Sequence, residues 1–265
     1  GDDDAAVDWA EREHRNLLQA VHSAADLGQD RLAWQLCEVM WLAQYPSAPD
    51  TDWIAVSPVG LAAAARAGDR GAQGRLLTDL GMRYTGIGRL PESLECHNKA
   101  LGIWRELNDR LAEASSLNLI GLIHLRTRRL DRAAQHFEQA LDVFREENSA
   151  YRIATALSNL ATTHHSAGRP EALTTARQAL SAHRAMDNQR GVGNILRIIS
   201  QVAREEGDVE EALAEARSAV DIALGLRDHH LEAYWLLTLG DAQQAADQLD
   251  DALASYHRSA TLHRR

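Results

Sequence analysis

The sequence predicts an all-α fold, a right-handed superhelical solenoid of antiparallel helix pairs. The main observation is a pattern of apolar and small residues that recurs about every 40 residues, a period typical of helical repeat proteins. Only five prolines and 5% aromatic residues occur among 265 residues, which suits a chain that is helical almost throughout. We expect about 13 helices in total.

The clearest copy of the pattern spans residues 117–140. Its first helix has Gly121 on the packed face, and its second helix has Ala133 and Phe137. Glycine and alanine have almost no side chain, so two antiparallel helices can approach closely there, and Phe137 fills the space beside them. This spacing is the tetratricopeptide repeat (TPR) signature.

Five copies of the unit follow one another with an almost constant spacing. In each first helix an apolar residue precedes a small one, and each second helix has a small residue at the corresponding place. The apolar–small pairs are Leu80-Gly81, Ile120-Gly121, Leu160-Ala161, Ile199-Ser200 and Leu239-Gly240. We therefore expect five TPR repeats within 71–265, at about 71–109, 110–149, 150–188, 189–228 and 229–265.

A degenerate repeat is expected before these five, at residues 31–70. The polar turn that ends each second helix also occurs at Gly68-Asp69, one period before the first clear repeat. Its two helices are expected near 31–44 and 53–67, separated by the proline-containing segment 45–49.

Residues 1–30 are expected to contain a lone leading helix near 8–27. Trp9, Leu17 and Val21 have spacings compatible with a single apolar face. Such a helix would act as a linker and cover the open end of the stack.

The composition argues against several classes of function. A formal net charge of −10 disfavours the phosphate backbone, so we expect no direct nucleic-acid binding by this segment. No apolar run approaches the roughly 18 residues that a membrane span needs. The acidic start of the chain is unlike a secretory signal, and Cys37 and Cys96 are expected to be free thiols. We expect a cytoplasmic protein without a membrane partner.

No catalytic constellation is evident in the sequence. The glycine-rich segment 68–74 lacks the lysine of a phosphate loop, and there is no nucleophile elbow or cysteine pair. The adjacent histidines at 164–165 and 229–230 would point about 100° apart on a helix and would not readily share a metal ion. We therefore expect no enzyme activity, no cofactor and no metal, and we interpret His124 and His164 as packing or surface residues. A bound metal or cofactor would favour an enzyme instead.

The concave face of the superhelix, formed by the first helices, is the candidate recognition surface. Amide, hydroxyl and guanidinium groups alternate there with leucine, which suits an extended peptide or protein segment, and an arginine would meet an acidic group. The alternative is that these residues are merely solvated. The candidates are Asn118, Leu122, Ser158, Thr162, His165, Asn194, Arg197, Gln201, Arg204 and Asp241.

Several features beyond the generic repeat resemble a known family. Gly-Arg-Leu turns, as at 88–90, accompany the period of about 40 residues, and residues 9–21 and 32–36 read WAEREHRNLLQAV and LAWQL. Together they resemble the C-terminal TPR arrays of bacterial AfsR-like (SARP) transcription regulators and related signal-transduction ATPases. In that family a DNA-binding domain and a nucleotide-binding domain precede the repeats, and the motifs of neither occur in these residues.

The resemblance implies a sensor domain. Binding of a protein, peptide or small inducer would relieve or impose restraint on the neighbouring ATPase and DNA-binding domains, which are themselves candidate partners. Because the chain has no initiator methionine, we expect an excised domain of a longer bacterial protein. The alternatives are a freestanding TPR scaffold or adaptor for complex assembly, and a peptide-pheromone receptor. The full-length gene would distinguish them.

Overall fold

The computed structural model describes residue 9, residues 12–42 and residues 50–264. Every regular element in these ranges is an α-helix, and the 13 helices confirm the predicted all-α class and helix number. None of these described helices is long and apolar enough to cross a membrane. The chain divides into two compact units, Gly1–Thr127 and Arg128–Arg265.

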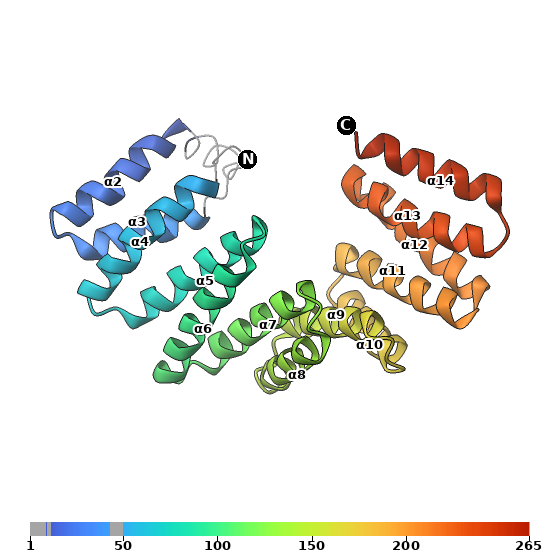
Figure 1. The fold of residues 1–265 in the computed structure, drawn as a ribbon, viewed down its shortest axis with the longest axis horizontal. Coiled ribbons are helices and arrows are strands. Elements are labelled where there is room, and N and C mark those ends of the chain that lie inside the picture. Colours follow the sequence, from blue (N-terminus) through green and yellow to red (C-terminus); the bar gives the residue numbers. More distant parts are fainter. Residues whose placement is uncertain (1–8, 10–11, 43–49, 265) are drawn as a thin grey trace. The chain divides into compact units, whose positions relative to one another are not determined.

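Six helices lie within the described residues of the first unit (Figure 1). They are α2 (His14–Asp26), α3 (Asp30–Leu42), α4 (Asp50–Arg66), α5 (Arg70–Gly86), α6 (Leu90–Leu107) and α7 (Arg110–Arg126). Each helix packs against the next along the chain, and α3 also contacts α5 directly. Trp34, Trp53 and Trp104 are buried in this unit.

The N-terminal helices differ in detail from the expectation. Helix α2 begins at His14, and Val21 is fully buried against the next helices, as predicted for a packed leading helix. Trp9 instead is 52% exposed, so it does not belong to the packed face. The predicted segment 45–49 between α3 and α4 lies outside the described residues.

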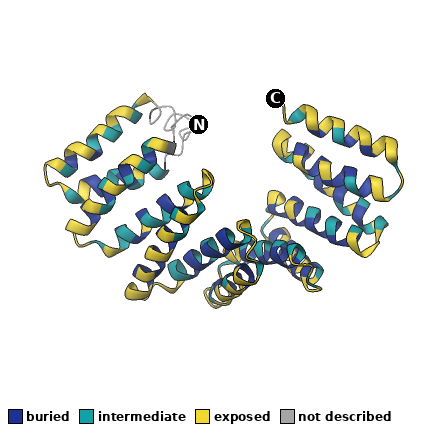
Figure 2. Cartoon of the chain, in the orientation of Figure 1, coloured by how far each residue is buried: buried dark blue, intermediate teal, exposed yellow. Residues whose placement is uncertain are grey.

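Seven helices make up the described part of the second unit. They are α8 (Leu130–Glu146), α9 (Ala150–Ser166), α10 (Ala172–Ala185), α11 (Gln189–Glu206), α12 (Val209–Leu226), α13 (His229–Ala245) and α14 (Leu249–Leu262). Consecutive helices again pack together, and the first helices α9, α11 and α13 also contact one another in turn. Figure 2 shows the buried residues along the faces where these helices meet.

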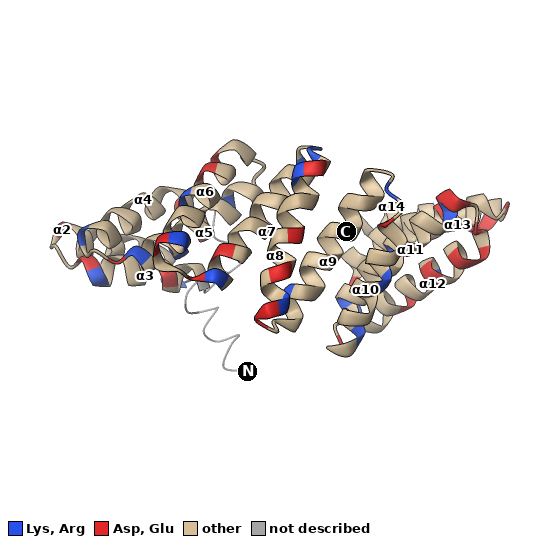
Figure 3. Ribbon diagram, turned by 90° about the horizontal axis from the view of Figure 1, so that it is seen from below, with Lys and Arg blue, Asp and Glu red and all other residues tan. Residues whose placement is uncertain are grey.

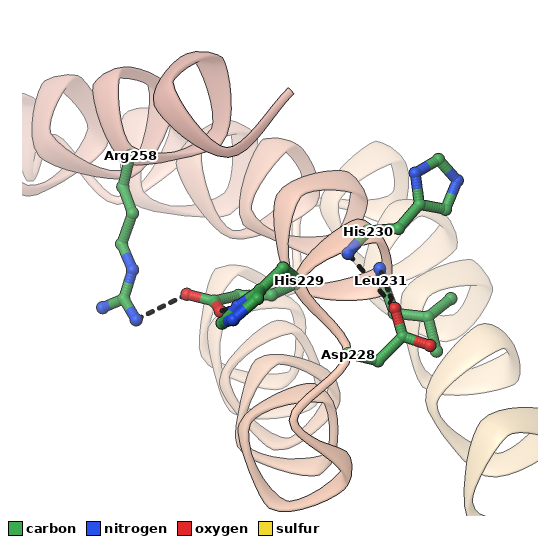
Figure 4. Close-up of polar contacts among 6 residues, drawn as sticks. Asp228, His229, His230, Leu231 and Arg258 are labelled. Carbon is green, nitrogen blue, oxygen red and sulfur yellow. Dashed lines mark hydrogen bonds and ion pairs between the residues drawn. The ribbon is translucent and has the colours of Figure 1, made fainter. Parts of the chain in front are cut away.

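The recurring turn between repeats has a simple physical basis. A residue with positive φ, such as Asn108 (55°) or Arg227 (54°), ends one helix, and the next residue caps the following helix. Asp228 accepts hydrogen bonds from the backbone N–H groups of His230 and Leu231 at 3.1 and 3.0 Å (Figure 4). The cap satisfies donors that the first turn of a helix leaves without a partner. The Asp-containing turn is therefore a helix start signal.

Size complementarity explains how each helix pair closes. A Cβ atom at Gly81 would lie 2.6 Å from the ring of His97, and one at Gly240 would lie 2.5 Å from the ring of Tyr256. The two glycines occupy the same repeat position, and so do the two rings. Where the first helix has Ala161 or Ser200 at that position, the second helix has alanine instead of a ring. Close packing therefore depends on the sum of the two side chains.

Candidate ligand-binding face

Helices α11 and α13 of the second unit bring four of the predicted residues to one face. Arg197, Gln201 and Arg204 lie at i, i+4 and i+7 on α11, and Asp241 lies on α13, which α11 contacts directly. The close approach of the two helices is built on Gly193. A Cβ atom there would lie 2.2 Å from the ring of Trp235, which is fully buried.

Arg197 is the most constrained residue of this face. Its guanidinium carbon lies 5.2 Å from the centroid of the Tyr234 ring, and its Nη1 donates a hydrogen bond to Gln201 Oε1 at 2.7 Å. Burial lowers the pKa of Arg197 from its ordinary value, because desolvation disfavours the charged form. The sequence placed this arginine on an open surface, but the structure has it half-buried.

Arg204 and Asp241 line an open cleft of about 420 Å³ together with Gln244 and Ala245. Tyr256 of α14 reaches this cleft, and its hydroxyl donates to Asp241 Oδ1 at 2.7 Å. Burial and this hydrogen bond raise the pKa of Tyr256 to about 12, so the phenol stays protonated at neutral pH. The cleft therefore has a cation, a carboxylate and an amide in its lining, and a tyrosine hydroxyl is hydrogen-bonded to the carboxylate.

Apolar side chains interrupt the polar residues of the same face. Tyr234 and Leu237 are three residues apart on α13, and they are 45% and 40% exposed. Acidic residues are prominent on α12, which forms a helix pair with α11 (Figure 3). The α11–α13 face, defined by Arg197, Gln201, Arg204, Tyr234, Leu237, Asp241 and Gln244, thus combines cations with exposed apolar groups.

Asn194 and His165 also lie on first helices of this unit. Asn194 is exposed on α11, and its Oδ1 accepts a hydrogen bond from the indole nitrogen of Trp235 at 3.3 Å. His165 on α9 lies 3.1 Å from a carboxylate oxygen of Glu205. Both have partners within the protein, so they are positioned beside the α11–α13 face rather than at its centre.

Ser158 has hydrogen-bond partners within its own helix pair. Its hydroxyl lies 2.9 Å from Nε2 of His183 and donates to the carbonyl of Ala154 at 2.8 Å. The half-buried side chain thus also takes part in the packing between α9 and α10, and its role in recognition stays a prediction. Thr162 is half-buried and donates to the carbonyl of Ser158.

Asn118 and Leu122 lie on α7 of the first unit, and both are half-buried. They therefore belong to a different unit from the α11–α13 face.

A second group of charged and aromatic residues was not predicted. In the first unit the guanidinium carbon of Arg83 lies 4.8 Å from the ring centroid of Trp41 and 5.0 Å from that of Trp53. One helical turn earlier, burial and the nearby Glu38 raise the pKa of Asp79 to about 7. The signal was present in the sequence, because α3 has two tryptophans two turns apart and α5 has charges of alternating sign at every fourth residue, Arg75, Asp79 and Arg83.

Comparison with known proteins supports the repeat assignment. The tetratricopeptide repeat family model matches residues 72–146. No curated protein matches the chain in sequence. The specific resemblance to AfsR-like (SARP) regulators stays a prediction.

Solved structures with the same fold share little sequence with the chain. The apo form of RapI is 14% identical, with a TM-score of 0.72, and the match covers 100% of this chain and 98% of RapI. A Rap protein complexed with Competence and Sporulation Factor is 13% identical, with a TM-score of 0.65 and coverage of 95% and 77%. A signal transduction ATPase with a TPR sensor from Pyrococcus horikoshii is 14% identical, with a TM-score of 0.55. The match covers 93% of this chain but 41% of that ATPase, and these likenesses establish a TPR-type solenoid fold.

Proposed function

We propose that this TPR-fold chain is a non-catalytic recognition domain that binds a peptide or an extended protein segment on the α11–α13 face. The observation that carries the proposal is the open cleft at Arg204 and Asp241 beside the exposed Tyr234 and Leu237. An extended segment has a hydrogen-bonding backbone and alternating side chains, and this face offers polar and apolar partners for both. Exposed large apolar residues that lie close together are typical of interaction sites.

The same proposal includes a regulatory role in a bacterial transcription regulator. The ATPase from Pyrococcus horikoshii, whose TPR region is named a sensor, supports this role by its similar fold. Ligand binding would change the equilibrium of attached ATPase and DNA-binding domains if the ligand had different affinities for their two states. The net charge of −10 favours a protein or peptide partner over nucleic acid, and the protein would act in the cytoplasm.

A freestanding peptide receptor or adaptor is the second candidate. The observation that favours it is the match to RapI, which covers 98% of that chain. The Rap structure complexed with Competence and Sporulation Factor points the same way. Phosphate-loop and winged-helix sequences upstream in the full-length gene would favour the regulator, and their absence would favour the receptor or adaptor.

The binding face can be tested by displaying random peptides against the chain. Peptides enriched on the parent should bind the double variant Tyr234→Ser/Leu237→Ser at least about tenfold more weakly, because aromatic and aliphatic anchors dominate such interfaces. The matched control is Leu224→Ser/Leu253→Ser, which changes exposed leucines on the second helices α12 and α14. Equal loss in both double variants, or no enrichment on the parent, would refute the proposed face.

A further inference from the structure

Arginines stacked on aromatic rings recur in this protein, and most of them have a carboxyl group close to the guanidinium. Arg75 lies over Trp34 and pairs with Glu38 at 2.6 Å. Arg89 lies over Tyr84 and pairs with a glutamate at 2.6 Å. A stacked guanidinium with an internal counterion is thus a common arrangement of the first unit.

Arg83, which stacks on two tryptophans, also has a carboxyl group nearby on the same helix. Asp79 lies one helical turn away on α5, and Arg83 lowers the pKa of that carboxyl group against the larger effect of burial.

Arg197 departs from this rule. It stacks on Tyr234 in the same manner, yet within the described residues no carboxylate pairs with it, and its one hydrogen bond goes to the neutral amide of Gln201. Its Nε is buried without a hydrogen-bond partner among the described residues. Arg197 is therefore a partly desolvated cation that has no counterion among the described residues.

A half-buried cation without a counterion is unfavourable in the free protein. Desolvation weakens its hydration, and no protein charge offsets the loss. A ligand anion that binds beside the guanidinium would supply the missing charge–charge attraction. This attraction is stronger in a partly desolvated site than in water. The ligand-free protein thus has a binding position for a negatively charged group beside Arg197.

We infer that Arg197 is the anchor for a carboxylate of the ligand, which takes the place that Glu38 has beside Arg75. This inference rests on the proposed function of the α11–α13 face. Tyr234 holds the guanidinium plane from one side, and Gln201 holds Nη1, so Nη2 is the donor left for the ligand. A planar carboxylate with a single charge matches one guanidinium. Arg204 is not the anchor, because it shares its cleft with Asp241.

The carboxylate can come from an acidic side chain or from a peptide C-terminus, and a paired peptide array separates these sources. One arm has peptides with both ends capped, each in a glutamate and a glutamine version. The other arm has peptides without acidic residues, each with a free and an amidated C-terminus. Binding of the labelled chain should favour the carboxylate member of at least one set of pairs by about tenfold or more.

Three variants test whether the preference for carboxylate peptides depends on Arg197. Arg197→Gln should abolish it, and Arg197→Lys should retain part of it, because lysine keeps the charge but loses the planar donor group. Arg217→Gln removes a positive charge from the exposed face of α12 and should leave the preference unchanged. A thermal melt of each variant confirms that it is folded.

The possible outcomes separate the two proposals. Peptides that bind equally well in both members of every pair would overturn the carboxylate inference and leave the recognition function standing. A preference that survives in folded Arg197→Gln would overturn the role of Arg197. If neither member of any pair binds, both the inference and the proposed function fail.

Discussion

Asp79 should make the stability of the first unit depend on pH. Its folded pKa is raised to about 7 from 3.8, first by burial and then by Glu38. Between these two values the unfolded chain has lost the proton while the folded protein keeps it. Stability should therefore decline as pH rises from about 4 to 7, and the deficit persists above the folded pKa.

The size of the effect follows from the shift. One pKa unit corresponds to about 1.4 kcal/mol, so the full shift corresponds to roughly 4 kcal/mol. Asp79 is partly exposed, and water screens part of this, so about 1–3 kcal/mol is a reasonable expectation. Asp79→Asn removes the titrating group and should be more stable than the parent by this amount at pH 8, with almost no difference at pH 4.

Urea unfolding at several pH values, followed by tryptophan fluorescence, measures this difference. Trp235 is the single tryptophan of the second unit, so the signal reports mainly on the first unit. The exposed Asp142→Asn serves as the control. A difference between Asp79→Asn and parent that is the same at every pH, or a less stable variant at pH 8, would refute the reasoning.

The remaining predictions concern acid stability, packing and nucleic acid. Burial lowers the pKa of His97 to about 4, so stability should fall by up to roughly 3 kcal/mol as pH decreases from 6.5 to 4; His97→Phe should lose this dependence in urea titrations, and an unchanged slope would contradict it. Gly193→Ala should destabilise by about 1–3 kcal/mol in thermal melts because its Cβ would meet Trp235, whereas Gly225→Ala, with open space around its Cβ, should be neutral or stabilising by up to about 1 kcal/mol. Similar melting of the two alanine variants would refute the packing argument. The chain should not shift duplex DNA in a gel at low salt, and salt-sensitive binding below micromolar protein would reveal a basic surface that the net charge conceals.

The sequence was sufficient for the helices because their spacing depends on local rules. A small residue every 40 positions or so and an Asp-capped turn determine where a helix begins and which side it packs. Both signals survive in the structure at Gly81 and Asp228. The face on which Arg197, Gln201 and Arg204 lie follows from the same helical periodicity.

The direction of individual side chains was harder to predict, because it depends on the residue across the interface. Ser158 has the periodicity of the open face, but the sequence did not indicate that its half-buried hydroxyl would lie 2.9 Å from Nε2 of His183 on α10. Tyr256 belongs to a second helix, and it reaches Asp241 because glycine on α13 leaves room for its ring. Such contacts join residues far apart in the chain, and no single window of sequence contains both partners.

The matched sizes at the helix-pair contact also constrain recombination of the repeats. A hybrid that joined a first helix with Ala161 to a second helix with Tyr256 would place a methyl group where the ring needs open space. The reverse hybrid, Gly240 opposite Ala176, would leave a void that costs stability. Duplication or shuffling that moves whole helix pairs keeps each match intact, whereas exchange of single helices breaks it. The unit that can be duplicated or exchanged in this protein is therefore the pair of helices. Hybrid proteins should tolerate a junction best in the Asp-capped turns between pairs.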